Sequence, residues 1–341
     1  MSNRIVCFGE IMMRLNPEGY LRFTQAARFE ASYAGGEANV AVSLANYGMD
    51  ASYVTKLPDN DLGRSARNAL RQFGVDTRDI VWGGPRLGIY FVEKGASQRA
   101  SKVIYDRAGS SIALAKRSDF DWDKILDGAT WFHFTGITPA LGGENPAICL
   151  DALEACKAKG ITVSCDLHYR GKLWTREQAG ETMAKLVPFV DTCIANEADA
   201  ADVFGIRAAG TDVDSGKLNK DGYVSVARQL QDRFGCKRVA ITLRTSLSAT
   251  RNLWAGMLWD GKEACFSPEY DITIVDRVGG GDSFGGGLIY ALANGYGTQD
   301  AINYAVAASC LKHSIEHDFN MMSVAEVKAL AAGNASGRVQ R

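Results

Sequence analysis

Short apolar runs alternate along the chain with longer segments whose apolar residues recur at helical spacing. The runs predict buried strands at residues 5–8, 51–55, 131–135, 161–166, 192–195 and 239–243. The longer segments predict helices at 38–47, 61–73, 145–159, 175–187, 222–235 and 299–312, with a further helix beginning near Phe284. This alternation is typical of an α/β fold in which helices cover both faces of a mostly parallel sheet.

Two segments depart from the alternation, at residues 11–33 and 87–105, where strand-like runs and turns follow one another. Extended segments inserted in an α/β layout can form a small sheet, a lid that excludes water from a transfer site. The alternative is that they are edge hairpins without a lid role. We expect one domain over residues 1–335, a surface loop at 207–221 and a frayed tail at 336–341.

The composition argues against several classes of protein. The formal net charge is −1 and both signs are interspersed, so the basic footprint of a nucleic-acid-binding protein is missing. No apolar run is long enough for a membrane span, and the N-terminus lacks a signal-peptide pattern, so we expect a cytoplasmic protein without membrane association. The eight cysteines form no CxxC pair or zinc spacing, which predicts buried free thiols.

The segment most informative about chemistry is DRVGGGDSFGGGLIYAL, residues 276–292. Gly279, Gly280 and Gly281 are expected to leave backbone N–H groups uncovered before a helix, which makes an anion site. Asp282 follows at the mouth of that turn. It is either a helix N-cap or a base that accepts the proton of an attacking hydroxyl while the N–H groups hold a phosphoryl group. No Gly-Lys-Ser/Thr follows, so this is not a Walker A loop.

A pair of glycines, Gly35 and Gly36, precedes the helix predicted at 38–47. The pair allows a polar ligand to approach the backbone, and Asn39 can donate to hydroxyl groups and accept from them. Taken alone, the segment is equally consistent with an ordinary helix start.

Together the two segments, AGGEANVAVSLANYG at 34–48 and DRVGGGDSF at 276–284, resemble the paired signatures of the PfkB, or ribokinase-like, carbohydrate kinase family. Arg277 stands where that family usually has Thr, and Gly280 where it usually has Ala. The resemblance covers the chain to about residue 330 and implies a three-layer α/β/α sandwich with a small β-sheet lid. It also implies transfer of the ATP γ-phosphoryl group to a sugar hydroxyl, with Asp282 as base and the three glycines as anion hole.

The same resemblance implies where the nucleotide binds. Asn196-Glu-Ala-Asp199 is similar to an element near the Mg²⁺-bearing phosphates, with a shorter acid at its end. Thr242 and Arg244 lie at the end of the strand 239–243, where Arg244 either faces solvent or contacts a phosphate. No spacing of ligands predicts a tightly held metal, so Mg²⁺ is expected to arrive with ATP. A monovalent-cation requirement is left open.

Two arginines bear on the identity of the sugar: Arg107 in YDRAG and Arg170 in DLHYRGKLW. A guanidinium group binds a carboxylate through two parallel hydrogen bonds, so the pair favours a sugar acid. The alternative is that each arginine is solvated or makes a structural ion pair, near Asp106 and Asp166 respectively.

These segments, with FGEIMMRL at 8–15, resemble the branch of the family that phosphorylates 2-keto-3-deoxygluconate to its 6-phosphate. His168 replaces the Asn that this branch has in the second segment. The resemblance implies that the sugar acid is contacted by Tyr90, Tyr105, Arg107 and Arg170, and its hydroxyl groups by Gly35, Gly36 and Asn39.

Three other functions stay open on the sequence. A neutral-sugar kinase of the fructokinase or ribokinase type shares most of these features, and so does a non-catalytic sugar-binding protein on the same fold. A nicotinamide-dependent oxidoreductase is disfavoured, because Gly9-Glu-Ile-Met follows the first strand where GxGxxG is required. Exposed lid strands can pair between subunits, which predicts a homodimer through the β lid.

Overall fold

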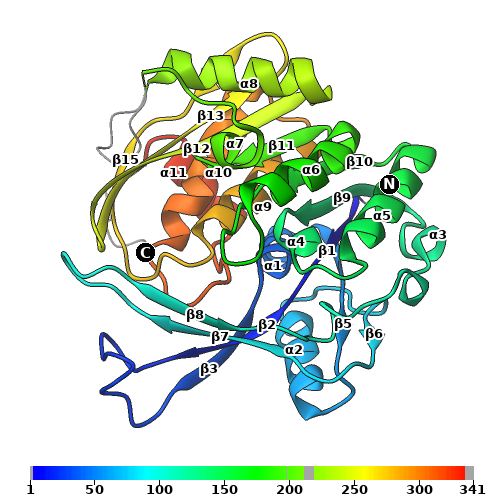
Figure 1. Cartoon of the computed structure of the whole chain (residues 1–341). Helices are drawn as coiled ribbons and strands as arrows, with labels where there is room; N and C mark the ends of the chain where they lie inside the picture. Colours follow the sequence, from blue (N-terminus) through cyan, green and yellow to red (C-terminus); the bar gives the residue numbers. More distant parts are fainter. Residues whose placement is uncertain (1–2, 197, 211–218, 335–341) are drawn as a thin grey trace.

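The computed structural model describes residues 3–196, 198–210 and 219–334. The large sheet of the described part contains these strands: β1 (Arg4–Phe8), β4 (Asp50–Val54), β9 (Ala129–Thr135), β10 (Thr162–Asp166), β11 (Thr192–Ala195), β12 (Arg238–Ser248), β13 (Arg251–Trp259), β14 (Ala264–Phe266) and β15 (Tyr270–Thr273). Their order is β14-β13-β12-β11-β10-β9-β1-β4, with β15 also beside β13 (Figure 1). The run from β4 to β12 is parallel, and β13 pairs antiparallel with β12, β14 and β15.

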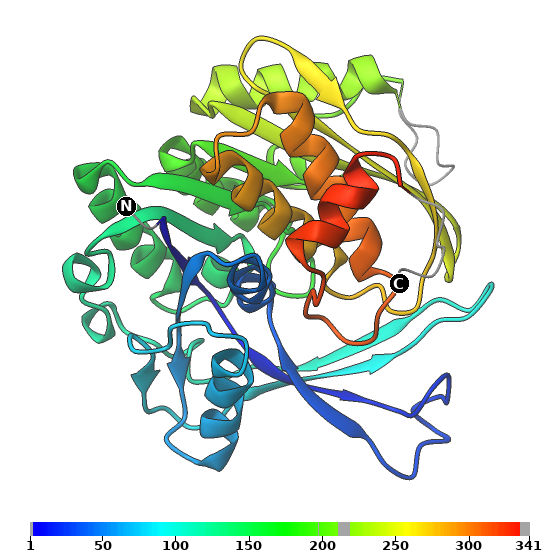
Figure 2. The ribbon, with the colours of Figure 1, turned by 180° about the vertical axis from the view of Figure 1, so that it is seen from behind.

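Successive residues of the parallel strands point to opposite faces of this sheet. In β1, Val6 and Phe8 pack into one apolar cluster, whereas Ile5 and Cys7 pack into another. The first face is covered by α3 (Trp122–Ile125), α4 (Ile137–Ala140), α5 (Asn145–Lys159), α6 (Arg176–Leu186), α7 (Asp199–Phe204) and α8 (Lys220–Phe234). The second face, seen in Figure 2, carries α1 (Gly36–Asn46), α2 (Asp61–Arg71), α9 (Gly280–Ala293), α10 (Thr298–Lys312) and α11 (Val324–Ala331).

A second, smaller sheet lies below the sandwich in Figure 1. It has the order β3-β2-β7-β8 and is formed by β2 (Met12–Asn16), β3 (Glu30–Ala34), β7 (Gly88–Glu93) and β8 (Lys102–Asp106). Its outer pairs are antiparallel, and β2 and β7 are parallel. The short strands β5 (Lys56–Leu57) and β6 (Val81–Trp82) pair separately, and two 3₁₀ turns lie at Arg117–Asp119 and Val187–Phe189.

The predicted sandwich and its small sheet are therefore confirmed, and both unusual segments, 11–33 and 87–105, contribute strands to that small sheet. Its function as a lid and the single-domain organisation stay predictions. The expected loop at 207–221 falls partly, and the tail at 336–341 wholly, outside the described residues.

Two predicted boundaries are wrong. Strand β12 continues to Ser248, far beyond Leu243, because β13 folds back and pairs with its whole length. Helix α9 begins at Gly280, not near Phe284, and Gly279 is its N-cap. Asp282 consequently lies inside the first turn, so the alternative that it serves as the N-cap is wrong.

Cysteine thiols in the described part are free, as predicted. Cys265 and Cys310 are half-buried and the other six are buried. Burial raises the pKa of the Cys310 thiol to about 11, which keeps it protonated and unreactive at neutral pH. None of the helices in the described ranges combines the length and apolarity needed to cross a bilayer.

Candidate active site

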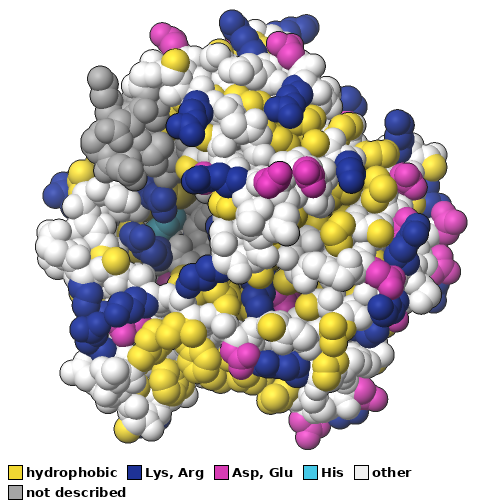
Figure 3. Space-filling model, viewed as in Figure 1, with side chains coloured by type: hydrophobic (Ala, Val, Ile, Leu, Met, Phe, Trp, Pro, Cys, Tyr) yellow, Lys and Arg dark blue, Asp and Glu magenta, His cyan; other side chains and the backbone are white. Residues whose placement is uncertain are grey.

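A cavity of about 400 Å³ opens at the carboxyl ends of the parallel strands, between the large sheet and the small one. Ligands of open α/β sheets bind at this edge because the loops that follow the strands diverge there. Figure 3 shows Lys and Arg side chains gathered around a hollow on this face, with a His side chain inside it. The predicted sugar-binding residues that line the cavity are Gly35, Gly36, Asn39, Tyr90, Tyr105, Arg107 and Arg170.

Asp282 lines the cavity from the first turn of α9, and its side chain is 11% exposed. The carboxylate accepts a hydrogen bond of 2.6 Å from the Asn39 side-chain amide. Burial, aided by the charges of Asp318 and Glu37, raises the pKa of Asp282 to about 7, and the bond from Asn39 opposes this shift. A carboxyl group that titrates near neutrality can accept a proton efficiently at neutral pH.

The glycine turn that precedes Asp282 is tightly enclosed on one side. Gly279 has φ of 84°, and a Cβ there would overlap the backbone carbonyl of Asp318, so both conformation and space require glycine. Gly279 and Gly281 line the cavity, whereas Gly280 is packed against the His313 ring. The Gly280 N–H donates to the Arg277 carbonyl at 3.4 Å. The expectation of three uncovered N–H groups is therefore wrong for Gly280.

Glu37 is a buried carboxyl group that the sequence analysis did not identify. It accepts hydrogen bonds from the Thr135 backbone N–H at 3.1 Å, the Thr135 hydroxyl at 2.8 Å and the Thr138 hydroxyl at 2.7 Å. Burial raises its pKa, against the effect of these bonds. Its position directly after the glycine pair was the available signal, and these bonds tie the first turn of α1 to the end of β9.

Arg107 pairs with Glu10, a buried residue just beyond β1. The Arg107 Nε donates to Glu10 Oε2 at 2.8 Å, Nη2 donates to the same oxygen, and the Ser110 hydroxyl donates to Oε1 at 2.6 Å. Asp106, the partner named in the ion-pair alternative, pairs with Arg86. The alternative of an ion pair for Arg107 is therefore met with Glu10 and not with Asp106, because Asp106 and Arg107 are consecutive residues at the end of β8 and diverge there.

His168 lies between two carboxyl groups. Its Nε2 is 3.3 Å from Asp166 Oδ2 and 3.7 Å from Asp282 Oδ1. Burial lowers the pKa of His168 and raises that of Asp166, so the imidazole is neutral at neutral pH. The φ of His168 is 39°, a left-handed conformation that His and Asn tolerate better than most residues.

Arg170 and Tyr90 form the remaining polar walls. Arg170 Nη1 donates to the Tyr169 carbonyl at 3.2 Å, and its charge opposes the raised pKa of Asp166. No ion pair joins Arg170 to Asp166 in the described residues, so that expected alternative is not met. Tyr90 donates its hydroxyl to Asp318 at 2.8 Å and presents its ring to the cavity.

The other half of the cavity collects the residues expected at the nucleotide. Asn196, Thr242 and Arg244 line it, but Asp199 does not. Asp199 is buried and accepts from the backbone N–H groups of Asn196 at 2.9 Å and Tyr169 at 3.1 Å, so it holds the loops behind the cavity. The cavity is also lined by residues to which the sequence analysis assigned no role in the site: Glu10, Asn252, Trp254, Arg277, His313 and Asp318.

The donor set beside the glycine turn fits an anion. Arg244 and Arg277 both line the cavity there, and burial together with the Arg244 charge lowers the pKa of Arg277. Two guanidinium groups and backbone N–H donors match phosphate oxygens. Across residues 3–196, 198–210 and 219–334, no group of three or more His, Cys, Asp or Glu side chains is arranged to hold a metal ion.

Comparison with known proteins agrees with this arrangement. A family model described as pfkB family carbohydrate kinase matches residues 2–315. The chain is 51% identical to 2-dehydro-3-deoxygluconokinase of Thermotoga maritima, and the two structures superpose with a TM-score of 0.94 over 98% of this chain and 99% of that one. It is 32% identical to 2-dehydro-3-deoxygalactonokinase of Haloferax volcanii over 99% of each chain.

A more distant relative, 2-dehydro-3-deoxygluconokinase of Thermoproteus tenax, is 27% identical over 92% of this chain and 89% of that protein. The family match spans nearly the whole described chain and includes both glycine-rich segments. The chain belongs to the pfkB family of carbohydrate kinases and is an ATP-dependent sugar kinase.

Proposed function

We propose that this kinase phosphorylates the terminal hydroxyl of 2-keto-3-deoxygluconate, also called 2-dehydro-3-deoxygluconate, and yields the 6-phosphate. One observation carries the proposal: the Asp282 carboxylate, bonded to Asn39 at 2.6 Å, lies in a cavity that also presents Arg107 and Arg170. The carboxylate supports proton abstraction, and the arginines support binding of an acid. The relatives named for this substrate and for its galactonate counterpart support the same class of sugar.

In the proposed reaction, Asp282 accepts the proton of the sugar hydroxyl as the hydroxyl oxygen bonds to the γ-phosphorus. The bond from that phosphorus to the bridging oxygen breaks, and ADP leaves. The N–H groups of Gly279 and Gly281 stabilise the transferring phosphoryl group, and Arg244 and Arg277 hold the phosphates. Mg²⁺, when bound with the nucleotide, neutralises phosphate charge.

Recognition of the acid is assigned to Arg107 and Arg170, which line the cavity. Nε and Nη2 of Arg107 donate hydrogen bonds to Glu10, so Nη1 is the donor that we propose for the substrate. Arg170 supplies the second guanidinium group, and Asn39, Gly35 and Gly36 lie where hydroxyl groups would bind. The stacked rings of Tyr90 and Tyr105, 6.0 Å apart, form the apolar side of this sugar site.

The test is a substrate panel with ATP and Mg²⁺. It contains 2-keto-3-deoxygluconate, its galactonate epimer, fructose and ribose, with ADP release as the readout. We expect the highest kcat/KM with 2-keto-3-deoxygluconate. A higher value with the galactonate epimer would keep the sugar-acid class and overturn the choice of epimer. Turnover of fructose or ribose with none of either acid would defeat the substrate assignment and favour a neutral-sugar kinase, while absence of turnover with every sugar would favour a non-catalytic sugar-binding protein.

We also propose a homodimer formed through the small sheet. Its outer side carries exposed apolar residues, with Ile104 53% exposed, and Phe23, Phe29 and Phe91 form an aromatic cluster there. Figure 3 shows apolar side chains gathered over the small sheet. Such a patch on an open sheet favours association. Light scattering that gives the mass of one chain would contradict this proposal.

The cytoplasmic location stays a prediction, and whether the kinase requires a monovalent cation stays open. The first is checked by fractionation of cells that make the protein. The second is checked by kcat in buffers that contain K⁺ or only a bulky organic cation.

A further inference from the structure

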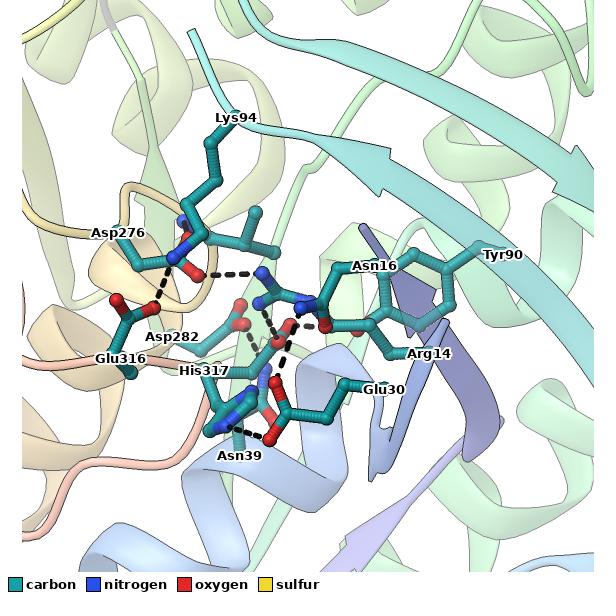
Figure 4. A network of polar contacts seen from close by, with 12 residues as sticks. Arg14, Asn16, Glu30, Asn39, Tyr90, Lys94, Asp276, Asp282, Glu316 and His317 are labelled. Atoms are coloured by element: carbon teal, nitrogen blue, oxygen red, sulfur yellow. Dashed lines mark hydrogen bonds and ion pairs between the residues drawn. The ribbon is translucent and has the colours of Figure 1, made fainter. Parts of the chain in front are cut away.

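Arg14 is a fully buried arginine that joins the small sheet to the segment around the glycine turn. It lies in β2, and its guanidinium group donates to two carboxylates from distant parts of the chain. Nη2 is 2.5 Å from Asp276 Oδ2 (Figure 4), and Nη1 is 2.5 Å from Asp318 Oδ1. Tyr90 of β7 donates to the other oxygen of Asp318 at 2.8 Å. Two strands of the small sheet therefore hold one carboxylate.

Both carboxylates shape the glycine turn. Asp276 Oδ1 accepts from the Val278 N–H at 3.1 Å, which fixes the residues directly before Gly279. The backbone carbonyl of Asp318 lies so close to Gly279 that a Cβ there would overlap it. The buried Lys312 ammonium donates to the Asp276 carbonyl at 3.2 Å, on the other side of that residue. The turn is thus held from two sides, and Arg14 links them.

Further contacts follow the same seam between the small sheet and residues 316–318. Lys94 pairs with Glu316, and His317 Nε2 lies 3.3 Å from Glu30 Oε1 (Figure 4). These contacts are more exposed than those of Arg14, so solvent screens them and they contribute less. Together with the Arg14 contacts, they connect residues 316–318 to the small sheet as far as its edge strand β3.

Arg14 does not line the cavity, so it acts through its partners. Asp318 does line the cavity, and its negative charge is one of the groups that raise the pKa of Asp282. Arg14 opposes that negative charge directly. Burying an arginine between two carboxylates costs desolvation free energy, and apolar side chains of similar volume often stabilise a protein equally or better. A role in the active site would explain why a charged residue, Arg14, is buried at this position.

We propose that Arg14 is a positioning residue for phosphoryl transfer, which fastens the small sheet to the glycine turn and neutralises Asp318 beside the base. The inference rests on the proposed role of Asp282 as that base. The titratable or charged groups that face Asp282 are Asp318, Glu37, Asp166, His168, Arg170 and Lys312. Of these, Asp318 is the one that Arg14 contacts directly.

Removal of Arg14 leaves the Asp318 carboxylate uncompensated, which favours protonated Asp282. In Arg14→Met we therefore expect the acid limb of the kcat/KM profile to move upward by about half a pH unit or more, since one nearby charge shifts a pKa by this order. Removal of the charge in Asp318→Asn should move it downward. The double variant Arg14→Met/Asp318→Asn should bring the limb back toward the wild-type position, although kcat stays reduced because the sheet is no longer fastened.

The experiment measures kcat/KM between pH 5 and 9 for the four proteins, with the sugar that the panel identifies and with Asp282→Asn as reference. Circular dichroism confirms that each variant is folded, and Asp318→Asn carries the test if Arg14→Met is not. If the acid limb of the kcat/KM profile lies at the same pH in every folded variant while Asp282→Asn is inactive, the proposed role of Arg14 is wrong and the role of Asp282 as base stands. An active Asp282→Asn overturns the proposed base instead. A limb that moves in Arg14→Met and stays displaced in the double variant overturns the neutralising role.

Discussion

The Asn39 side-chain amide and the Asp282 carboxylate form a hydrogen bond of 2.6 Å that joins the first turns of α1 and α9. The two residues are 243 positions apart in the sequence. Each follows its own glycine-rich segment, so the bond brings the sugar side and the phosphate side of the cavity to one carboxyl group (Figure 4). The chemistry proposed for this kinase depends on the position of the Asp282 carboxylate between these two sides.

The first prediction concerns the pH dependence of the wild-type enzyme. A base must be ionised to accept a proton, and burial raises the pKa of Asp282 to about 7. We expect kcat/KM to rise with pH through that region and to level off above it. A profile that is flat from pH 5 to 8 would contradict the assignment.

The second prediction concerns Asn39. Its hydrogen bond favours the ionised form of Asp282, so Asn39→Ala should raise the pKa of Asp282 and move the acid limb to higher pH. Asn39→Asp is the matched variant, because it keeps the size of the side chain but adds a negative charge. We expect the larger upward displacement in Asn39→Asp. An unchanged limb in both variants would show that the bond does not influence the base.

The third prediction concerns stability. Burial raises the pKa of Asp282 from its ordinary value of 3.8 to about 7 in the folded chain, so its contribution to stability is fully present below pH 3.8 and is lost as pH rises from there through 7. Asp282→Asn should therefore be more stable than wild type at pH 8, by up to about 4 kcal/mol at about 1.4 kcal/mol per pKa unit. The difference should shrink at pH 5. Urea denaturation at the two pH values measures it, and a less stable variant at pH 8 would be the contrary result.

The fourth prediction separates structure from recognition at Arg107. Arg107→Met leaves the buried Glu10 carboxylate unpaired, which should cost about 3–5 kcal/mol. Arg107→Met/Glu10→Leu should recover most of this stability. If Arg107 contacts the sugar acid, KM stays high in the double variant; if KM recovers with stability, the arginine is only structural. Arg86→Met, whose pair with Asp106 is exposed, is the control and should change stability by less than about 1 kcal/mol.

The sequence predicted the sandwich because its parallel strands are buried apolar runs and its helices carry regular apolar spacing. It also marked Asn39 and Asp282 as site residues, because each follows a glycine-rich segment, where backbone and ligand can approach closely. For Arg107 it left an ion pair near Asp106 open as the alternative to substrate binding, and it missed Glu10, which is distant in sequence but adjacent in space. Arg14 and Asp318 escaped notice because their pairing spans 304 positions and no local pattern marks it.

The role of Asp282 as the base is decided by Asp282→Asn, which replaces the carboxylate with an amide of the same size that cannot accept the proton. Turnover of 2-keto-3-deoxygluconate with ATP and Mg²⁺ is compared with binding of the same sugar acid by calorimetry. We predict that kcat falls by about a thousandfold or more while the dissociation constant of the sugar changes by less than about tenfold. Wild-type kcat in this variant would show that Asp282 is not the base.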